Sequence, residues 1–123
     1  MFDHEVTELL ELNLAHFTGT EQYHRFHSQT VFTDGALYLA EVARCFWLMD
    51  VFASHLSEIS TDHGMACLSL KRVGEGAQVV IDDGDENILA KQLIEYTDFP
   101  LNEITLFACW NGQFWIIMLV SEY

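Results

Sequence analysis

The chain has 123 residues and a mass of 14.1 kDa, the size of one compact domain, and half of its residues are apolar. This composition excludes disordered, collagen-like and linker-rich classes, and predicts a single domain over residues 1–123. Nineteen acidic residues against five Lys and Arg give a formal net charge of −14. That charge argues against direct nucleic-acid binding, because few cations are present to replace the counterions of a phosphate backbone.

The N-terminal half predicts two helices. Apolar residues at helical spacing over residues 3–17, with acids on the other side, indicate a short amphipathic helix. Residues 21–32 show no clean period and predict an irregular connection that can hold a short extended piece. Thr33 is a good N-cap, and one long, largely buried helix is expected to follow it to about Ser57. Asp50 is the one acid that interrupts the apolar surface of this helix.

The C-terminal half has the pattern of β-strands. Extended segments bounded by turn residues are expected at 65–73, 77–81, 87–96, 104–110 and 113–120. The segment 87–96 suits a helix about as well, and we assign it to a strand because it is short and turns bound it on both sides. Asn111-Gly112 between two β-rich runs predicts a hairpin with a type I′ turn.

This order of elements predicts an α+β fold, in which helices precede a meander of four to five antiparallel strands. One face of the sheet would pack on the long helix. The order is similar to that of cystatin-like and nuclear-transport-factor-like folds, an analogy that supplies no function.

Asp50 is the first candidate for chemistry. A carboxylate on an apolar helix surface must be hydrogen-bonded, paired or protonated, and in a pocket it could serve as a ligand anchor or general base. Trp47 would form a wall of such a pocket and Ser54 would lie beside it. The alternative is structural: Asp50 caps a backbone segment or pairs with Arg25 or Arg72.

Aromatic residues near the C-terminus are the second candidate. Trp110, Phe114 and Trp115 would mediate self-association if the sheet exposes them, or build the core if it does not. No nucleophile-elbow, P-loop or dinucleotide-binding glycine motif is present in the sequence, so no catalytic residue and no cofactor are assigned.

Two short motifs contain residue types that can bind metals. His24 and His27 are spaced to share a helix face, but no second pair completes a zinc site. Residues 82–87 superficially suggest a calcium loop, yet the EF-hand spacing fails, and a hairpin tip is predicted there. No metal site is therefore assigned.

The compartment follows from cysteines and hydropathy. Cys45, Cys67 and Cys109 form no Cys-x-x-Cys pair and lie in apolar runs, as buried thiols in a reducing compartment do. The longest apolar run, 114–120, is too short to span a membrane, and the acidic start lacks the positive charge of a signal peptide. We expect a cytoplasmic protein without a membrane partner.

Several short motifs resemble one known family. They are His16-Phe17-Thr18-Gly19-Thr20-Glu21, Thr33-Asp34-Gly35, Leu39-Ala40-Glu41, Trp47-Leu48-Met49-Asp50 and Glu95-Tyr96-Thr97-Asp98-Phe99-Pro100-Leu101. From about Leu12 to Tyr123 the chain is similar to a family of small bacterial proteins, also found in cyanobacteria and on mobile elements, that is known only as a domain of unknown function. The resemblance supports the order of elements and implies no catalytic residue.

Three functional hypotheses follow. The first is a non-enzymatic accessory or binding protein that acts through protein–protein contacts, with a homodimer as the expected state. The second is a small-ligand binder or enzyme with a helix–sheet pocket around Asp50. The third, from the charge and the mobile-element association of the similar family, is an acidic decoy that occupies the basic groove of a nucleic-acid-binding protein.

Overall fold

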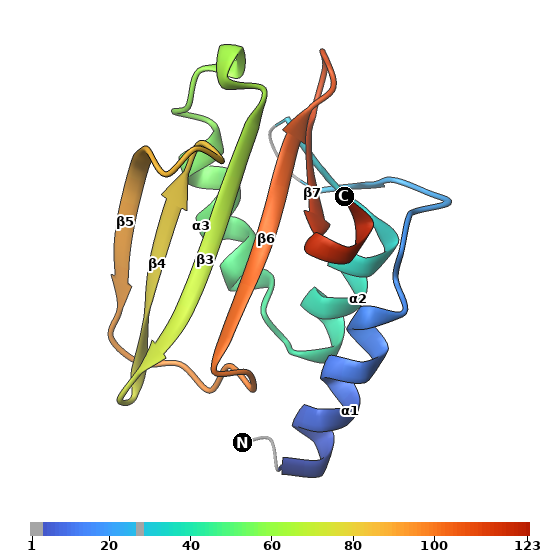
Figure 1. Ribbon diagram of the computed structural model, residues 1–123, viewed down its shortest axis with the longest axis vertical. Helices are drawn as coiled ribbons and strands as arrows, with labels where there is room; N and C mark the ends of the chain where they lie inside the picture. The colour runs from blue at the N-terminus through green and yellow to red at the C-terminus, as the bar shows by residue number, and fades with distance from the viewer. Residues whose placement is uncertain (1–3, 27–28) are drawn as a thin grey trace.

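The computed structural model describes residues 4–26 and 29–123 (Figure 1). Over these residues the chain forms three α-helices, two 3₁₀ turns and one mixed sheet of seven strands in the order β1-β2-β7-β6-β3-β4-β5. None of the helices in this part of the chain is long and apolar enough to cross a membrane. The predicted α+β class is confirmed, whereas the antiparallel meander of four to five strands is wrong.

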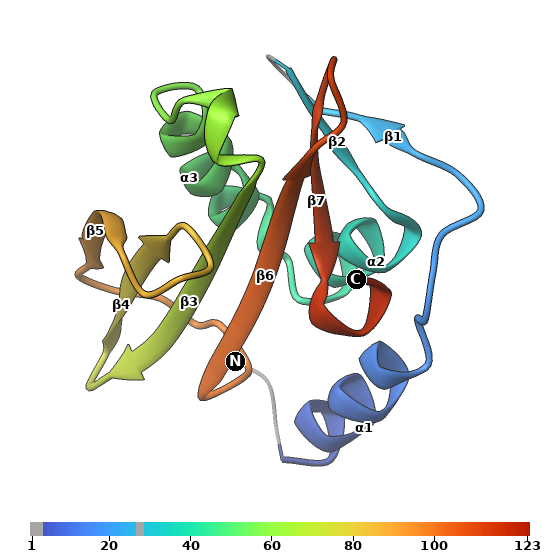
Figure 2. The ribbon, with the colours of Figure 1, turned by 45° about the horizontal axis from the view of Figure 1, so that its top comes forward.

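The first half of the chain contains all three helices. They are α1 (His4–Ala15), α2 (Asp34–Val42) and α3 (Phe46–Leu56). Two short strands, β1 (His24–Arg25) and β2 (Thr30–Phe32), lie between α1 and α2, in the segment predicted to be irregular. Figure 2 shows β2 beside β7, with which it pairs in parallel, and β1 on the far side of β2. The β2–β7 pairing joins segments more than eighty residues apart in the sequence, so no local sequence pattern predicts it.

The second half supplies the remaining strands. They are β3 (Met65–Val73), β4 (Gly76–Asp82), β5 (Ile88–Ile94), β6 (Glu103–Trp110) and β7 (Trp115–Leu119), with 3₁₀ turns η1 (Thr61–His63) and η2 (Val120–Glu122). The strand assignment of residues 87–96 is confirmed by β5. The predicted hairpin after β6 is also confirmed, but its turn is not type I′, because Asn111 has no positive φ and a four-residue loop joins Trp110 to Trp115.

The expected single long helix is broken at residues 43–45. Thr33 caps α2 as predicted, with its Oγ1 accepting from the backbone N–H of Ala36 at 3.2 Å. Arg44 then adopts a φ of +53°, and the N–H of Cys45 donates to the carbonyl of Ala40 at 2.9 Å. A left-handed residue followed by such a bond is a common way to end a helix. Because α3 restarts in a new direction, the helical phase of residues before the break does not carry over to Asp50.

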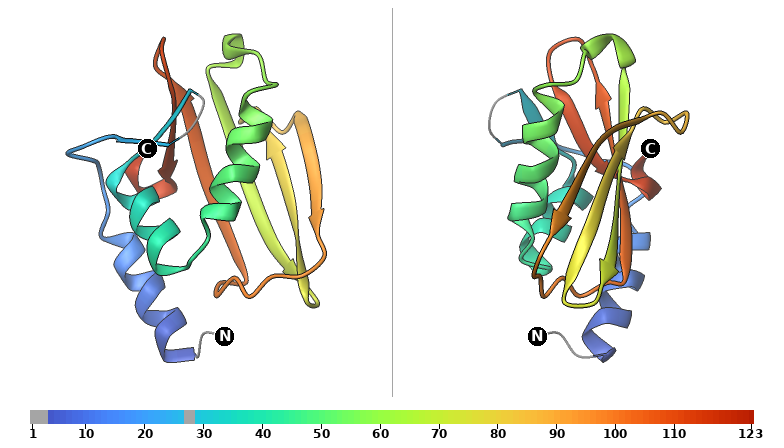
Figure 3. Two further views of the ribbon diagram at one scale, coloured as in Figure 1. Left: turned by 180° about the vertical axis from the view of Figure 1, so that it is seen from behind. Right: turned by 90° about the vertical axis from the view of Figure 1, so that its left-hand side faces the viewer.

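The core lies between the sheet and the helices α2 and α3, which cover the same face (Figure 3). Large side chains from both layers are fully buried there: Leu39, Leu48, Met49, Phe52, Leu68, Leu70, Leu106 and Ile117. Alternation along β3 and β6 sends every second residue into this core, while the residues between them point to the opposite face. The helices therefore leave one face of the sheet uncovered.

Candidate interaction face

The side of the sheet opposite α2 and α3 is called here the open face, and its residues form rows across the strands. One row runs Val31–Ile116–Cys109–Met65 across β2, β7, β6 and β3, and the next runs Met118–Phe107–Cys67. Thr105 and Ser69 pair in a third row. None of these side chains carries a charge, while the second row continues to Asp82 on β4 and the third to Val80 on β4 and Lys91 on β5. On β2, β7, β6 and β3 the rows thus form an uncharged strip in a protein whose formal net charge is −14.

The apolar residues of the open face pack into a cluster separate from the main core. Val31, Ile116 and Met118 are only 5–8% exposed, and half-buried Phe107, Cys109 and Phe114 pack against them. A sheet that packs helices on one side usually carries polar residues on its solvated side. Core packing against α2 and α3 does not explain this second cluster, so it is the candidate functional site.

Two side chains frame the open face. The guanidinium of Arg25, the outward residue of β1, lies 5.2 Å from the ring centroid of Phe114. The ring of Tyr123, which is 70% exposed, contacts the Phe107 ring edge-on at a centroid distance of 5.3 Å. Figure 3 shows η2 on this side of the sheet, away from α2 and α3. The strip is thus bordered by a cation at one corner and by an exposed aromatic ring.

The two cysteines of the open face are poor nucleophiles. Burial raises the pKa of Cys109, and burial together with the nearby Asp82 carboxylate raises the pKa of Cys67. Burial also raises the pKa of Cys45, inside the core, to about 12. All three thiols are therefore protonated at neutral pH, and none is activated for covalent catalysis.

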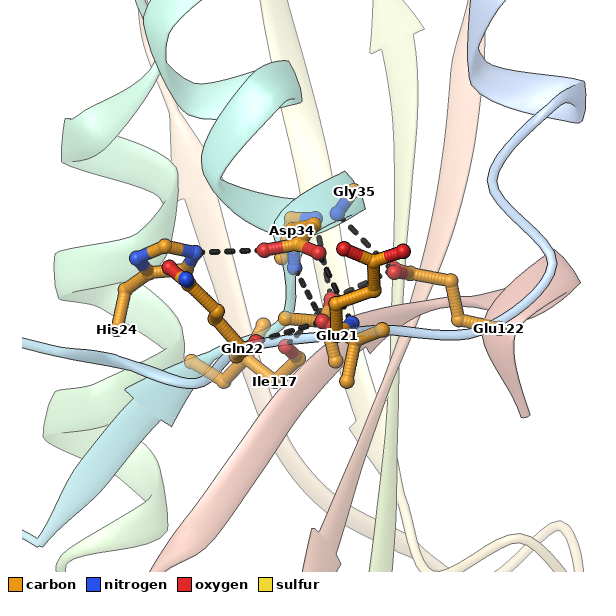
Figure 4. A network of polar contacts seen from close by, with 10 residues as sticks. Glu21, Gln22, His24, Asp34, Gly35, Ile117 and Glu122 are labelled. Atoms are coloured by element: carbon orange, nitrogen blue, oxygen red, sulfur yellow. Dashed lines mark hydrogen bonds and ion pairs between the residues drawn. The ribbon is translucent and has the colours of Figure 1, made fainter.

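Residues of the family-like motifs meet at the start of α2, where the carboxylate of Glu122 closes a polar network (Figure 4). Its Oε1 accepts from Thr33 Oγ1 at 2.6 Å and from the N–H of Leu119 at 3.0 Å, and its Oε2 accepts from the N–H of Gly35 at 3.0 Å. Gly35 leaves room for this carboxylate, since a Cβ there would come within 2.5 Å of Oε1. The network ties the chain after β7 to a helix N-terminus.

Asp34 holds the other side of this network. Its Oδ1 lies 2.7 Å from His24 Nε2, its Oδ2 accepts from the N–H of Glu21 at 3.0 Å, and its own N–H donates to Thr20 Oγ1 at 2.8 Å. The hydrogen bond with His24 is the main cause that lowers the pKa of Asp34 below its ordinary value of 3.8. The arrangement anchors residues 20–24 to α2 and holds β1 in place.

Substituting Asp34→Asn tests this anchor through pH. Because the pKa of Asp34 is lower in the folded protein than in the unfolded chain, its ionised form stabilises the fold at pH values above 3.8. That contribution is lost as the pH falls through the lowered pKa. We expect the difference in unfolding free energy between wild type and Asp34→Asn to shrink across this range in urea titrations. Exposed Asp62→Asn is the control, and an equally large acid-dependent difference for it would refute the assignment.

The structure does not support the pocket expected around Asp50. Asp50 and Ser54 are exposed on α3, and Trp47 is half-buried. A cavity of about 250 Å³ lies against the same helix, but α3 lines it with Ala53 and Leu56 and not with Asp50. Asp50 therefore faces solvent, because the break before α3 changes the direction that the long-helix pattern implied.

The three aromatic residues predicted for an interface lie on different sides of the sheet. Trp115 is 3% exposed and belongs to the core, so the expectation that it is surface-exposed is wrong. The Trp110 ring lies 5.6 Å from that of Trp115, centroid to centroid, with the two ring planes tilted by 60°, and packs on the same core. Phe114 alone of the three reaches the open face. Its neighbours Ile116 and Met118 were not among the predicted interface residues, because their apolar character resembles that of ordinary core strands.

Residues of the predicted histidine and calcium motifs make hydrogen bonds within the fold. His27 lies outside the described residues, and His24 is engaged with Asp34. The oxygens of Asp83 accept from the N–H of Asp85 and from the side chain of Asn87, which closes the predicted hairpin tip. Among residues 4–26 and 29–123, no group of three or more His, Cys, Asp or Glu side chains is placed to hold a metal ion.

A cavity of about 570 Å³ lies beside the 95–101 motif and is lined by Arg72 and Glu75 among others. The guanidinium of Arg72 already donates to the carbonyls of Phe99, at 2.5 Å, and of Gly76, at 3.2 Å. The N–H of Thr97 donates to the carbonyl of Glu75 at 2.9 Å. These bonds hold the motif against the β3–β4 turn, so Arg72 has a structural role.

Comparison with known proteins gives one match. Residues 8–123 match a protein-family model described as "Family of unknown function (DUF6876)". The matched range contains the motifs that meet around α2 and around Arg72. No curated protein and no solved structure matches the chain.

Proposed function

Because the chain belongs to the DUF6876 family, whose function is unknown, we propose a function from its geometry. It is a non-enzymatic binding protein that acts through protein–protein contacts, and its open face binds a second copy of the same chain. The observation that carries this proposal is the uncharged apolar cluster on the side of the sheet opposite α2 and α3.

Charge favours a second copy as the occupant. Two molecules that each carry a formal net charge of −14 repel one another over most of their surfaces. On β2, β7, β6 and β3 the rows of the open face bear no charge, and their charged side chains, Arg25, Asp82 and Lys91, lie on β1, β4 and β5, toward the ends of the rows. Two copies can therefore meet on these four strands without opposing like charges. A basic partner, as in the decoy hypothesis, would instead be attracted to the acidic surface and would leave this apolar strip unused.

The size of the open face suits a small dimer. Its three rows span five, three and two strands, and ten positions about 4.8 Å apart across the strands and about 7 Å apart along them give roughly 340 Å² on each copy. Two copies would then bury about 700 Å², which is the size of a weak, transient contact. We therefore expect a dimer of low affinity that depends on the concentration of the protein.

The thiols and the exposed carboxylate support a binding function over a catalytic one. The raised pKa values of Cys67 and Cys109 keep these thiols protonated at neutral pH. Exposure of Asp50 removes the burial on which its role as a general base or ligand anchor was argued. All three residues thus lack the environment that activates a catalytic group.

Sedimentation equilibrium of the purified protein at low and high salt tests the proposal. We expect a monomer–dimer equilibrium whose dissociation constant falls as salt rises, because salt screens the repulsion between two acidic molecules while the apolar contact remains. A monomer at every concentration and salt level would overturn it. A complex that forms only with a basic protein and dissociates in salt would favour the decoy hypothesis.

A further inference from the structure

We infer that the two copies pack face to face about a two-fold axis that runs parallel to the strands between β6 and β7. In this arrangement Arg25 of each copy faces the acidic β4–β5 turn of the other. The inference rests on the proposed function and adds the orientation of the partner. Three features carry it: the row in which Arg25 lies, the position of the acidic turn, and the match of apolar residues across the axis.

Arg25 and the acidic turn lie at opposite ends of one row. Arg25 pairs with Val31, and the row continues through Ile116 and Cys109 to Met65. The β4–β5 turn adjoins the end of this row, since a Cβ on Gly84 would lie 3.6 Å from the sulfur of Met65. The open face therefore has a cation at its β1 corner and acids beside its β3 end.

The acids of this turn are held at the surface. The side chains of Asp82 and Asp83 accept from the backbone N–H groups of Gly84 and Asp85, respectively, which fixes the loop. Asp85 and Glu86 are exposed at its tip. Arg25, stacked over Phe114, is likewise held on the open face. Arg25 and the backbone of the turn are thus in place before a partner arrives, which limits the entropy lost when the charges pair.

A two-fold axis along the strands exchanges the two ends of each row. Centred between β7 and β6, it places Ile116 opposite Cys109 of the partner and Val31 opposite the partner's Met65. In the next row it places Met118 opposite the partner's Phe107, against which the partner's Tyr123 ring also lies. Apolar residues therefore meet apolar residues, and Arg25 meets the acidic turn. Sheets that pack face to face with nearly aligned strands are a common arrangement.

The alternative in-plane axis, perpendicular to the strands, keeps each strand opposite its own copy. It would place Arg25 near the partner's Arg25 and one acidic turn near the other. Such like-charge contacts cost free energy at an interface, and they add to the repulsion between two acidic proteins. Charge complementarity therefore selects the axis parallel to the strands.

Charge reversal tests this orientation. We expect Arg25→Glu alone to raise the dimer dissociation constant roughly fivefold to tenfold, because it creates two repulsive contacts per dimer. Asp85→Arg alone should raise it less, because the other acids of the turn remain. The double variant places opposite charges at this pair again and should bind more tightly than Arg25→Glu alone. Arg44→Glu, which makes the same charge change at the α2–α3 break, is the matched control and should behave as wild type.

The outcomes separate this inference from the proposed function. If the wild type dimerises but the double variant is as weak as the two single changes combined, the orientation is wrong and the open face remains the interface. If the wild type never dimerises, the proposed function itself fails. Thermal unfolding of each variant at a concentration where it is monomeric shows whether loss of the Arg25–Phe114 contact has weakened the fold instead.

Discussion

Substituting Glu122→Ala is expected to lower the free energy of unfolding by about 2 to 4 kcal/mol. The Glu122 carboxylate accepts from the hydroxyl of Thr33 and from the N–H groups of Gly35 and Leu119. Its removal leaves these donors without that partner in a partly buried site and takes a negative charge from the N-terminus of α2. Urea unfolding followed by circular dichroism measures the loss.

Two further variants show whether the loss comes from this network. Glu122→Gln keeps one acceptor oxygen, so it should lose about half as much stability as the alanine variant. Exposed Glu41→Ala removes an acid from the same helix and should change stability by less than about 0.5 kcal/mol. An alanine variant at Glu122 that is as stable as Glu41→Ala would contradict the role of the network.

Local chemistry made much of the fold predictable. The N-cap at Thr33, the strand over residues 65–73 and the hairpin around Asn111-Gly112 each depend on a few neighbouring residues, and each is present. The strand at 87–96 followed from the turns that bound it. In all four cases the physical cause lies within about ten residues of the element, where sequence patterns carry their information.

Long-range pairing and backbone strain were not predictable. The strand β2 forms by pairing with β7 far along the chain, and its three residues give no period of their own. The helix break at Arg44 contains neither glycine nor proline, so helical spacing continues through it. That error also misplaced Asp50, because its predicted burial assumed one continuous helix.

The candidate site was only partly predictable for a related reason. Residues 115–119 are apolar at every position, which predicts a strand buried on both faces. All five side chains are buried, on one face under the helices and on the other among neighbouring side chains such as Phe107 and Phe114. A strand that is apolar at every position needs cover on both faces, and this chain has too few helices to cover both faces of its sheet. That combination is the sequence signal for the open face. No local sequence pattern pointed to the role of Glu122, since its partners at the start of α2 are distant in the sequence.

Substituting Cys109→Glu is expected to abolish dimerisation. Cys109 lies half-buried on the open face beside Ile116, near the proposed two-fold axis, so both copies would place a carboxylate within the contact. Burying two unpaired carboxylates among apolar side chains should raise the dissociation constant about a hundredfold or more. The single chain should tolerate the change, because an outward glutamate can extend to water when the face is free.

A control variant and a second test variant accompany Cys109→Glu. Ser54→Glu adds the same charge on exposed α3, on the opposite side of the sheet, and should leave dimerisation unchanged apart from a small general repulsion. Thr105→Glu adds a carboxylate at another outward position of β6 and should weaken the dimer as well. It keeps the test informative if Cys109→Glu proves too unstable to purify.

Sedimentation equilibrium of Cys109→Glu and Ser54→Glu, side by side with wild type in high salt, is the measurement that tests the open face most directly. The account predicts that wild type and Ser54→Glu dimerise at the same concentrations and that Cys109→Glu stays monomeric while folded. A folded Cys109→Glu that dimerises like wild type, or a Ser54→Glu that loses the dimer instead, would contradict it.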